Sequence, residues 1–200
     1  MITHLSINNL KLHDHTDLDL NGLTILTGMN GMGKSTVIQS LILLRQSFMM
    51  NDLDAGLNLK GDLCDAGISG ELACQASREH TLNIDMKFAE QADLNFSFEY
   101  PDNIMDTMLP GAEDNETSKA VLSKYSLFNE KFQYLSAFRF GPQKSYNRDT
   151  SLVVTKKQIS KSMGQCEYAV HFLEQYKNLN IPIEELAIID EEDITPDYRL

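Results

Sequence analysis

Nine consecutive residues near the start of the chain have the types and spacing that bind a nucleoside triphosphate. Residues 28–36 read Gly-Met-Asn-Gly-Met-Gly-Lys-Ser-Thr and fit the P-loop pattern G-x-x-x-x-G-K-[ST]. Glycine lacks a Cβ atom, so successive backbone N–H groups can turn inward around phosphate oxygens. The lysine of this pattern reaches the β- and γ-phosphates, and the hydroxyl after it binds Mg²⁺. The residues expected to bind the nucleotide are Gly28, Asn30, Gly31, Gly33, Lys34, Ser35 and Thr36, with Lys34 also catalytic and Ser35 also the metal ligand.

The residues on either side of the loop predict the elements that must position it. Residues 23–27 form a short apolar run with β-branched members, which predicts a buried strand entering the loop. After the loop, apolar residues recur at helical spacing and predict a buried helix that ends near Met50 and Asn51. A strand, a glycine loop and a buried helix are the context that this motif requires. The alternative, a glycine-rich turn that merely precedes a lysine, is disfavoured by that context.

The composition limits the class of protein. Two hundred residues, 42% of them hydrophobic, suit one domain or slightly more with a sizeable core. The net charge of −12 argues against nonspecific binding of nucleic acid by this segment alone. No secretion signal and no membrane-spanning apolar run is found, so a cytoplasmic location is expected. Cys64, Cys74 and Cys166 lack metal-ligand spacing, and we interpret them as buried thiols in a reducing compartment.

The rest of the chain predicts a mixture of strands and helices. Residues 2–10 and 15–20 predict a first hairpin, and strict alternation over 82–88 and 94–100 predicts a second one, with 71–77 as an added strand. Residues 120–132 and 167–177 predict helices, and 134–138 predict a strand. The second helix is expected to bury Ala169, Phe172, Leu173 and Tyr176. The basic stretch 143–162 is interpreted as a solvated loop rather than a phosphate-binding patch. We therefore expect strands, P-loop and first helix over 1–51, an antiparallel β subdomain over 70–100, a mobile acidic excursion over 101–118, and helices and a strand over 119–200.

Several of these stretches together resemble a known family. Residues 5–11, a hairpin, and the run L-T-I-L-T-G-x-N-G-x-G-K-S-T resemble the RecF/SMC-like branch of the ABC-type ATPases. Residues 134–142 and 164–173 are similar to a bacterial group of predicted AAA-type ATPases with an uncharacterised C-terminal region, of which some relatives serve in anti-phage defence. The resemblance implies an α/β P-loop NTPase head with an antiparallel β subdomain inserted after the first helix. It also implies ATP and Mg²⁺ as cofactors, a homodimer of heads, and coupling to DNA or to a separately encoded effector.

The resemblance extends to residues outside the loop. It implies a glutamine that senses the γ-phosphate and Mg²⁺, for which Gln75 is the candidate. The family's aromatic residue after the first strand, which supports the adenine, is replaced here, and its role is absent or passes to His13 or His15. For each histidine we favour a core or surface role.

Two later stretches could complete a catalytic site. Residues 162–165, Ser-Met-Gly-Gln, resemble the family's signature loop, and an apolar run ends in Asp190 and Glu191. Asp190 would then bind Mg²⁺, and Glu191 would activate the attacking water. We favour a solvated acidic loop at Asp190 and Glu191 instead. The resemblance implies a helix over 164–173, ahead of the signature region, and a chain that is the N-terminal portion of a longer ATPase. On that view the chain also lacks the strands that flank the P-loop strand.

Three functions therefore stay open. The first is ATP binding, with hydrolysis only in a full-length dimer. The second is a complete compact ATPase that uses Ser162 to Gln165 and Asp190-Glu191. The third is a nucleotide-binding scaffold without turnover.

Overall fold

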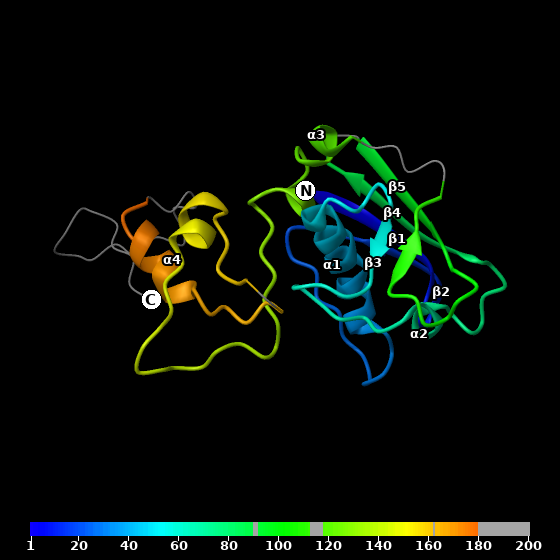
Figure 1. Cartoon of the computed structure of the whole chain (residues 1–200), viewed down its shortest axis with the longest axis horizontal. Helices are drawn as coiled ribbons and strands as arrows, with labels where there is room; N and C mark the ends of the chain where they lie inside the picture. Colours follow the sequence, from blue (N-terminus) through cyan, green and yellow to red (C-terminus); the bar gives the residue numbers. More distant parts are fainter. Residues whose placement is uncertain (90–91, 113–117, 162, 180–200) are drawn as a thin grey trace. The chain divides into compact units, whose positions relative to one another are not determined.

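The computed structural model describes residues 1–89, 92–112, 118–161 and 163–179 of the chain. The chain divides into two compact units, Met1–Tyr134 and Leu135–Leu200 (Figure 1). Over the described ranges, none of the helices has the length and apolar character needed to cross a membrane. The P-loop pattern and the helix that follows it both belong to the first unit.

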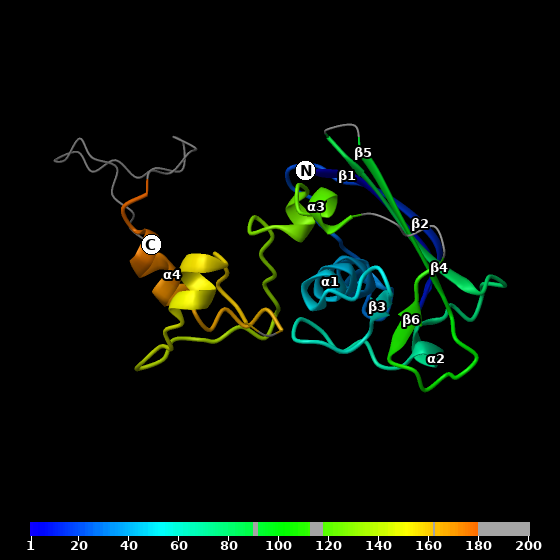
Figure 2. The same ribbon diagram turned by 45° about the horizontal axis from the view of Figure 1, so that its top comes forward.

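The first unit is built on a four-stranded antiparallel sheet. Its strand order is β2-β1-β4-β5, so the two hairpins that the sequence predicts lie side by side in one sheet (Figure 2). The β4–β5 ribbon therefore continues the N-terminal hairpin, because β4 pairs with β1 as well as with β5. The strands are β1 (Ile2–Leu10), β2 (His13–Asp19), β4 (Thr81–Phe88) and β5 (Ala92–Glu99).

The register of this sheet separates an apolar face from a polar one. Ile7 pairs with Ile84, which pairs with Phe96, and all three side chains are buried. Their neighbours Ser6 and Asp85 also pair with each other, on the opposite face. A slip by one residue would turn the apolar side chains to solvent, so burial of one face determines the register.

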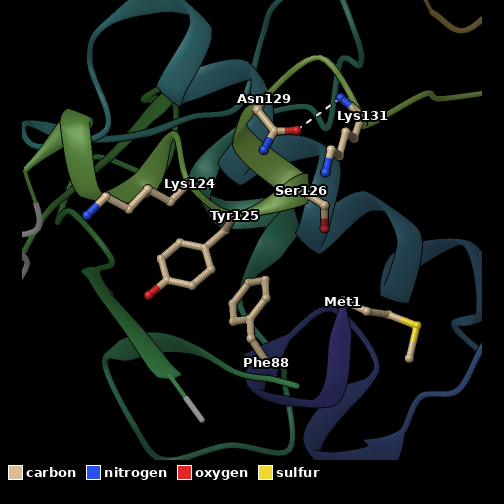
Figure 3. A pocket seen from close by; sticks show the side chains of 7 residues that line it. All are labelled: Met1, Phe88, Lys124, Tyr125, Ser126, Asn129 and Lys131. Atoms are coloured by element: carbon tan, nitrogen blue, oxygen red, sulfur yellow. Dashed lines mark hydrogen bonds between the residues drawn. The ribbon is translucent and has the colours of Figure 1, made fainter. Parts of the chain in front are cut away.

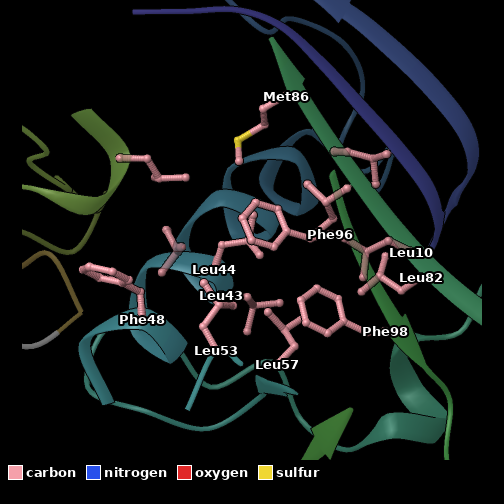
Figure 4. Packing of buried hydrophobic residues seen from close by; sticks show 14 of the residues in the cluster. Leu10, Leu43, Leu44, Phe48, Leu53, Leu57, Leu82, Met86, Phe96 and Phe98 are labelled. Atoms are coloured by element: carbon pink, nitrogen blue, oxygen red, sulfur yellow. The ribbon is translucent and has the colours of Figure 1, made fainter. Parts of the chain in front are cut away.

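Helix α1 (Lys34–Met50) packs on the apolar face. Every residue from 42 to 48 is buried, which confirms the predicted buried helix. Figure 4 shows its side chains meeting those of β4 and β5 in one core. The helix ends at Asn51, whose left-handed backbone (φ 62°) lets its N–H donate to the Phe48 carbonyl at 3.2 Å. The residues that meet in this core include Leu43, Leu44, Phe48, Leu82, Met86, Phe96 and Phe98.

One cation lies inside this core. Arg45 is only 6% exposed, and its Nη1 donates to the Leu127 carbonyl at 2.9 Å. Its guanidinium lies 5.5 Å from the centre of the Phe132 ring. Burial lowers the pKa of Arg45 to about 10, so the side chain stays charged at neutral pH. Arg45 thus joins α1 to the 3₁₀ turn Ser126–Phe128.

Shorter elements also pack against α1. Strands β3 (Gly56–Asn58) and β6 (Met108–Pro110) form a second, two-stranded antiparallel sheet. The Gln46 side chain of α1 donates to the Asn58 carbonyl at 2.8 Å and accepts from the Cys64 N–H at 3.1 Å. Two short helices, α2 (Ser69–Leu72) and α3 (Lys119–Leu122), complete the described part of this unit.

The second unit contains helix α4 (Ala169–Tyr176) and a single π-helical turn, Ser151–Thr155. The Tyr176 hydroxyl donates to the Val153 carbonyl at 3.2 Å. His171, the buried residue of α4, accepts from the Asp149 N–H at 3.2 Å. The predicted helix is thus confirmed, but its buried residue is His171. Leu173 is 46% exposed, and Ala169, Phe172 and Tyr176 are only partly buried.

The largest departure from the sequence-based expectation concerns residues 23–27. They form no strand, and Leu23 and Ile25 are 80% and 72% exposed. Leu26 alone of this run packs partly against the core. An extended segment becomes a strand only when its backbone groups pair with a neighbour. Among the described residues no strand pairs with this segment, so the prediction of a buried strand is wrong here.

Four other predicted elements are also corrected. Residues 71–77 belong to α2 and a loop, because Glu71 lies in the helix and the chain turns after Cys74. The stretch 101–118 is not simply a mobile excursion, since β6 pairs with β3 and Leu109 is fully buried; residues 113–117 lie outside the described ranges. The helix predicted over 120–132 is reduced to α3 and the 3₁₀ turn. The strand predicted over 134–138 is irregular chain whose Phe138 is 86% exposed.

Two leucine-to-alanine changes test this assignment of core and surface. Leu82→Ala should lower the free energy of unfolding by about 2–5 kcal/mol, because it opens a cavity at a fully buried site. The matched control Leu23→Ala should change it by less than about 0.5 kcal/mol, because that side chain lies in solvent. Urea unfolding of both variants measures the difference. An equal loss at the two positions would show that residues 23–27 are buried after all.

Candidate functional site

The candidate site is the backbone loop that leads into α1. Gly31 and Gly33 both have φ near 82°, a left-handed conformation that residues with a Cβ adopt only at a cost. Gly33 caps the helix with its carbonyl, which accepts from the Thr36 N–H at 2.9 Å and the Val37 N–H at 3.3 Å. No described side chain caps this helix end. The first N–H groups of α1, at Lys34 and Ser35, are therefore left for a ligand, and the helix dipole favours an anion there.

The ammonium group of Lys34 is held by the loop itself. Its Nζ donates to the carbonyls of Gly28 at 2.7 Å and Met29 at 2.6 Å. An ammonium has three N–H donors, so one remains for a phosphate oxygen. The loop carbonyls orient the lysine without neutralising its charge, which a carboxylate partner would do.

The two hydroxyl residues after the lysine are not equivalent. Ser35 is exposed at the first turn of α1, where its hydroxyl is accessible to a hydrated metal ion. Thr36 is 7% exposed, and its N–H already donates to Gly33. The Ser35 hydroxyl could therefore hold a metal ion, whereas Thr36 is packed within the helix. The metal role of Ser35 and the nucleotide-binding role of Thr36 stay predictions.

His13 contacts the P-loop backbone directly. Its Nε2 lies 3.0 Å from the Gly33 carbonyl oxygen, and its Nδ1 lies 2.8 Å from the Thr16 hydroxyl. A Cβ on Gly33 would come within 2.5 Å of the imidazole Nε2. The ring can therefore keep this position only if residue 33 has no side chain. Sequence reasoning considered His13 for adenine support or for a core or surface role and missed this contact. The nearest signal was the position of His13 in the hairpin that precedes the loop.

His15 belongs to the polar face of the sheet instead. Its Nε2 lies 2.7 Å from the Asp17 carboxylate, and its other ring nitrogen bonds to Asn8. A hydrogen bond from Ser6, followed by the neighbouring histidines His15 and His4, lowers the pKa of Asp17. His15 is therefore a surface histidine, as the sequence favoured.

Gln75 lies in an exposed turn after α2. This region is attached near the loop, because the Lys11 N–H donates to the Leu72 carbonyl while the Lys11 ammonium donates to Gln39 of α1 at 3.1 Å. No described interaction joins Gln75 to residues 28–36. Its role in sensing the phosphate stays a prediction.

The stretches proposed to complete catalysis are only partly described. Asp190, Glu191 and Ser162 lie outside the described residues, and their roles stay predictions. The carbonyls of Gly164 and Gln165 each accept a backbone hydrogen bond at 2.9 Å, from Ser136 and Phe140. Positive φ angles at positions 163, 164 and 166 make this stretch a turn. The helix predicted over 164–173 is therefore wrong in its first half, because α4 begins at Ala169.

The thiols and the described carboxylates offer no second catalytic centre. Burial raises the pKa of Cys64 to about 11 and also raises that of Cys166, so both thiols are protonated at neutral pH. Cys74 is buried, which agrees with the predicted structural role. Within the part of the chain that the structure describes, no cluster of three histidine, cysteine, aspartate or glutamate side chains could hold a metal ion.

A cavity of about 340 Å³ lies elsewhere in the first unit. The rings of Phe88 and Tyr125 form one wall, with centroids 4.5 Å apart, and the Lys131 side chain points toward Ser126 (Figure 3). Its lining contains no residue of the P-loop and no carboxylate or imidazole that could activate the Ser126 hydroxyl. The cavity can hold a small ligand, and the ionisable side chains that line it are Lys124, Tyr125 and Lys131.

Comparison with known proteins identifies one family. A family model described as AAA ATPase domain matches residues 1–195 of the chain. No curated protein matches the chain. The match covers the P-loop, the antiparallel sheet and α4.

Two glycine-to-alanine changes test the loop geometry. Gly33→Ala should lower the free energy of unfolding by at least about 1–2 kcal/mol, because alanine is strained at this left-handed position and its Cβ meets His13. The control Gly22→Ala should stay within about 0.5 kcal/mol, because nothing lies within 4 Å of its Cβ. Thermal unfolding of the two variants measures the effect. Equal stability of both would contradict the loop conformation described above.

Proposed function

This chain belongs to the family of AAA ATPase domains, and from that premise we propose that its P-loop binds ATP with Mg²⁺ as part of a RecF/SMC-like ATPase head. Nucleotide binding of the ATPase type is the general function of that family. The observation that supports ATP binding at this loop is the set of hydrogen bonds made by the Lys34 ammonium. Two loop carbonyls hold its ammonium at the start of α1, and its third donor remains for a phosphate.

Each described residue of the loop has a defined part in this proposal. Backbone N–H groups of Lys34 and Ser35 donate to phosphate oxygens, and the remaining N–H of the Lys34 ammonium donates to an oxygen of the β- or γ-phosphate. The exposed Ser35 hydroxyl is a ligand of Mg²⁺, which completes its shell with phosphate oxygens and water. When bound, Mg²⁺ neutralises the charge that develops on the phosphates during transfer.

We further propose that two heads come together around the nucleotide. The loop carries two exposed methionines, Met29 at 75% and Met32 at 60%, and the preceding segment exposes Leu23 and Ile25. Apolar side chains beside a nucleotide site are suited to be covered by another protein surface. A second head is the occupant that the sequence resemblance implies. In that assembly, hydrolysis would control DNA or a separately encoded effector.

A nucleotide-binding scaffold without turnover is the second candidate. It is favoured by one observation: among the described residues, α1 has no acidic residue in its first turn and no carboxylate bonds to residues 28–36. A compact ATPase that uses Asp190 and Glu191 requires those side chains to reach this loop. The two alternatives differ in whether the chain alone releases phosphate.

Two lysine-to-alanine changes test nucleotide binding. With MgATP at a hundred times its dissociation constant, the wild-type chain should be stabilised by about 2.7 kcal/mol. Lys34→Ala should lose this stabilisation, because it removes the donor to the phosphates. The control Lys131→Ala should keep it, because that lysine lines the other cavity. Thermal unfolding with and without MgATP measures the effect.

The outcomes of that experiment separate the alternatives. No stabilisation of the wild-type chain at saturating MgATP contradicts the proposed function. Loss in Lys131→Ala with retention in Lys34→Ala would place the nucleotide in the Phe88–Tyr125 cavity instead. We expect no phosphate release by this chain alone, whereas steady release would favour the compact ATPase.

A further inference from the structure

We propose that His13 is a positioning residue for the P-loop, which aims the Lys34 backbone N–H at the nucleotide by holding the Gly33 carbonyl. This inference rests on the proposed function and adds a residue to that site. His13 lies outside the P-loop pattern and is 20 positions away from Gly33 in the sequence. The loop motif alone therefore does not include it.

The Gly33 carbonyl and the Lys34 N–H belong to one peptide unit. In a planar trans peptide, the carbonyl of one residue and the N–H of the next point in opposite directions. The Gly33 carbonyl points toward His13 and the first turn of α1. The Lys34 N–H of the same peptide unit must therefore point away from them, to the side where phosphates bind. A hydrogen bond that holds the Gly33 carbonyl therefore also determines the direction of the Lys34 N–H.

Gly33 needs such a restraint. Glycine has the largest backbone freedom of all residues, and Gly33 has φ 82° and ψ 2° just before the helix begins. Its carbonyl accepts from the Thr36 N–H at 2.9 Å and from the Val37 N–H at 3.3 Å, and both donors belong to the first turn of the helix itself. The imidazole at 3.0 Å adds a restraint from outside the helix. A hydrogen bond to the carbonyl also polarises the peptide and makes its N–H a stronger donor.

The imidazole is itself oriented by the sheet. A carbonyl oxygen can only accept, so His13 Nε2 carries a proton and donates. In the neutral ring Nδ1 must then accept, and the Thr16 hydroxyl lies 2.8 Å from it. Thr16 pairs with Ile7 in the centre of β1. Hydrogen bonds thus run from the sheet through Thr16 and His13 to the peptide that precedes Lys34.

Adenine stacking is the competing role for this ring. Both ring nitrogens are engaged at the edge of the imidazole, and stacking would use its face. The two roles require different chemistry, because positioning needs an N–H donor whereas stacking needs an aromatic ring. His13→Gln keeps a donor of similar reach without the ring, and His13→Phe keeps a ring without the donor.

The test measures dissociation constants for MgATP and for inorganic tripolyphosphate with Mg²⁺, which has no base. His13→Phe should weaken both ligands about threefold to tenfold, as expected for one lost hydrogen bond. His13→Gln should restore both to near the wild-type value. The matched control His15→Phe should leave both unchanged, because His15 bonds to Asn8 and Asp17 on the polar face of the sheet.

Other results would overturn the inference. Unchanged affinity for both ligands in His13→Phe, or weakening in His13→Gln alone, contradicts positioning. Weaker MgATP with unchanged tripolyphosphate in His13→Gln would assign the ring to adenine. If the wild-type chain binds neither ligand, the proposed function fails. In that case the carbon NMR shift of the Gly33 carbonyl in the ligand-free protein tests whether His13 holds this carbonyl. If it does, the shift of His13→Phe differs from that of the wild-type chain, and the shift of His13→Gln returns to the wild-type value.

Discussion

The structure depends on the burial of α1 against one face of an antiparallel sheet. Residues 42 to 48 are all enclosed, so the helix cannot slide or rotate without exposing apolar side chains. Its first turn is therefore held at a defined place beside the β1–β2 hairpin. A loop with three glycines, at positions 28, 31 and 33, would otherwise be free to take many conformations. The core supplies the rigidity that the loop lacks.

The site uses backbone dipoles and one cation rather than carboxylates. Gly28 and Met29 orient the Lys34 ammonium through their carbonyls, and the start of α1 adds unpaired N–H groups. This arrangement suits an anion and has no described base beside it. The first unit can therefore explain binding, whereas cleavage of the bound nucleotide requires groups beyond those described in the site.

The sequence predicted the local features of this molecule well and the non-local ones poorly. The helical spacing after residue 34 and the alternation from Leu82 to Phe88 are local patterns, and the buried helix and the strand that they predict are confirmed. The pairing of β1 with β4 joins distant segments, which no local pattern can show. Residues 23–27 have strand-like composition, but a strand also needs a neighbour to pair with. The contact of His13 with Gly33 depends on how the hairpin folds toward the loop, so it too was missed.

Amide NMR of the chain titrated with MgATP would locate the bound nucleotide, because each N–H reports its own surroundings. We predict the largest shifts at the amides of Gly31, Gly33, Lys34 and Ser35. The amides of Asn83 and Asp85, on the polar face of the sheet, should move little. Largest shifts at Phe88, Tyr125 and Ser126, around the separate cavity, would contradict this prediction.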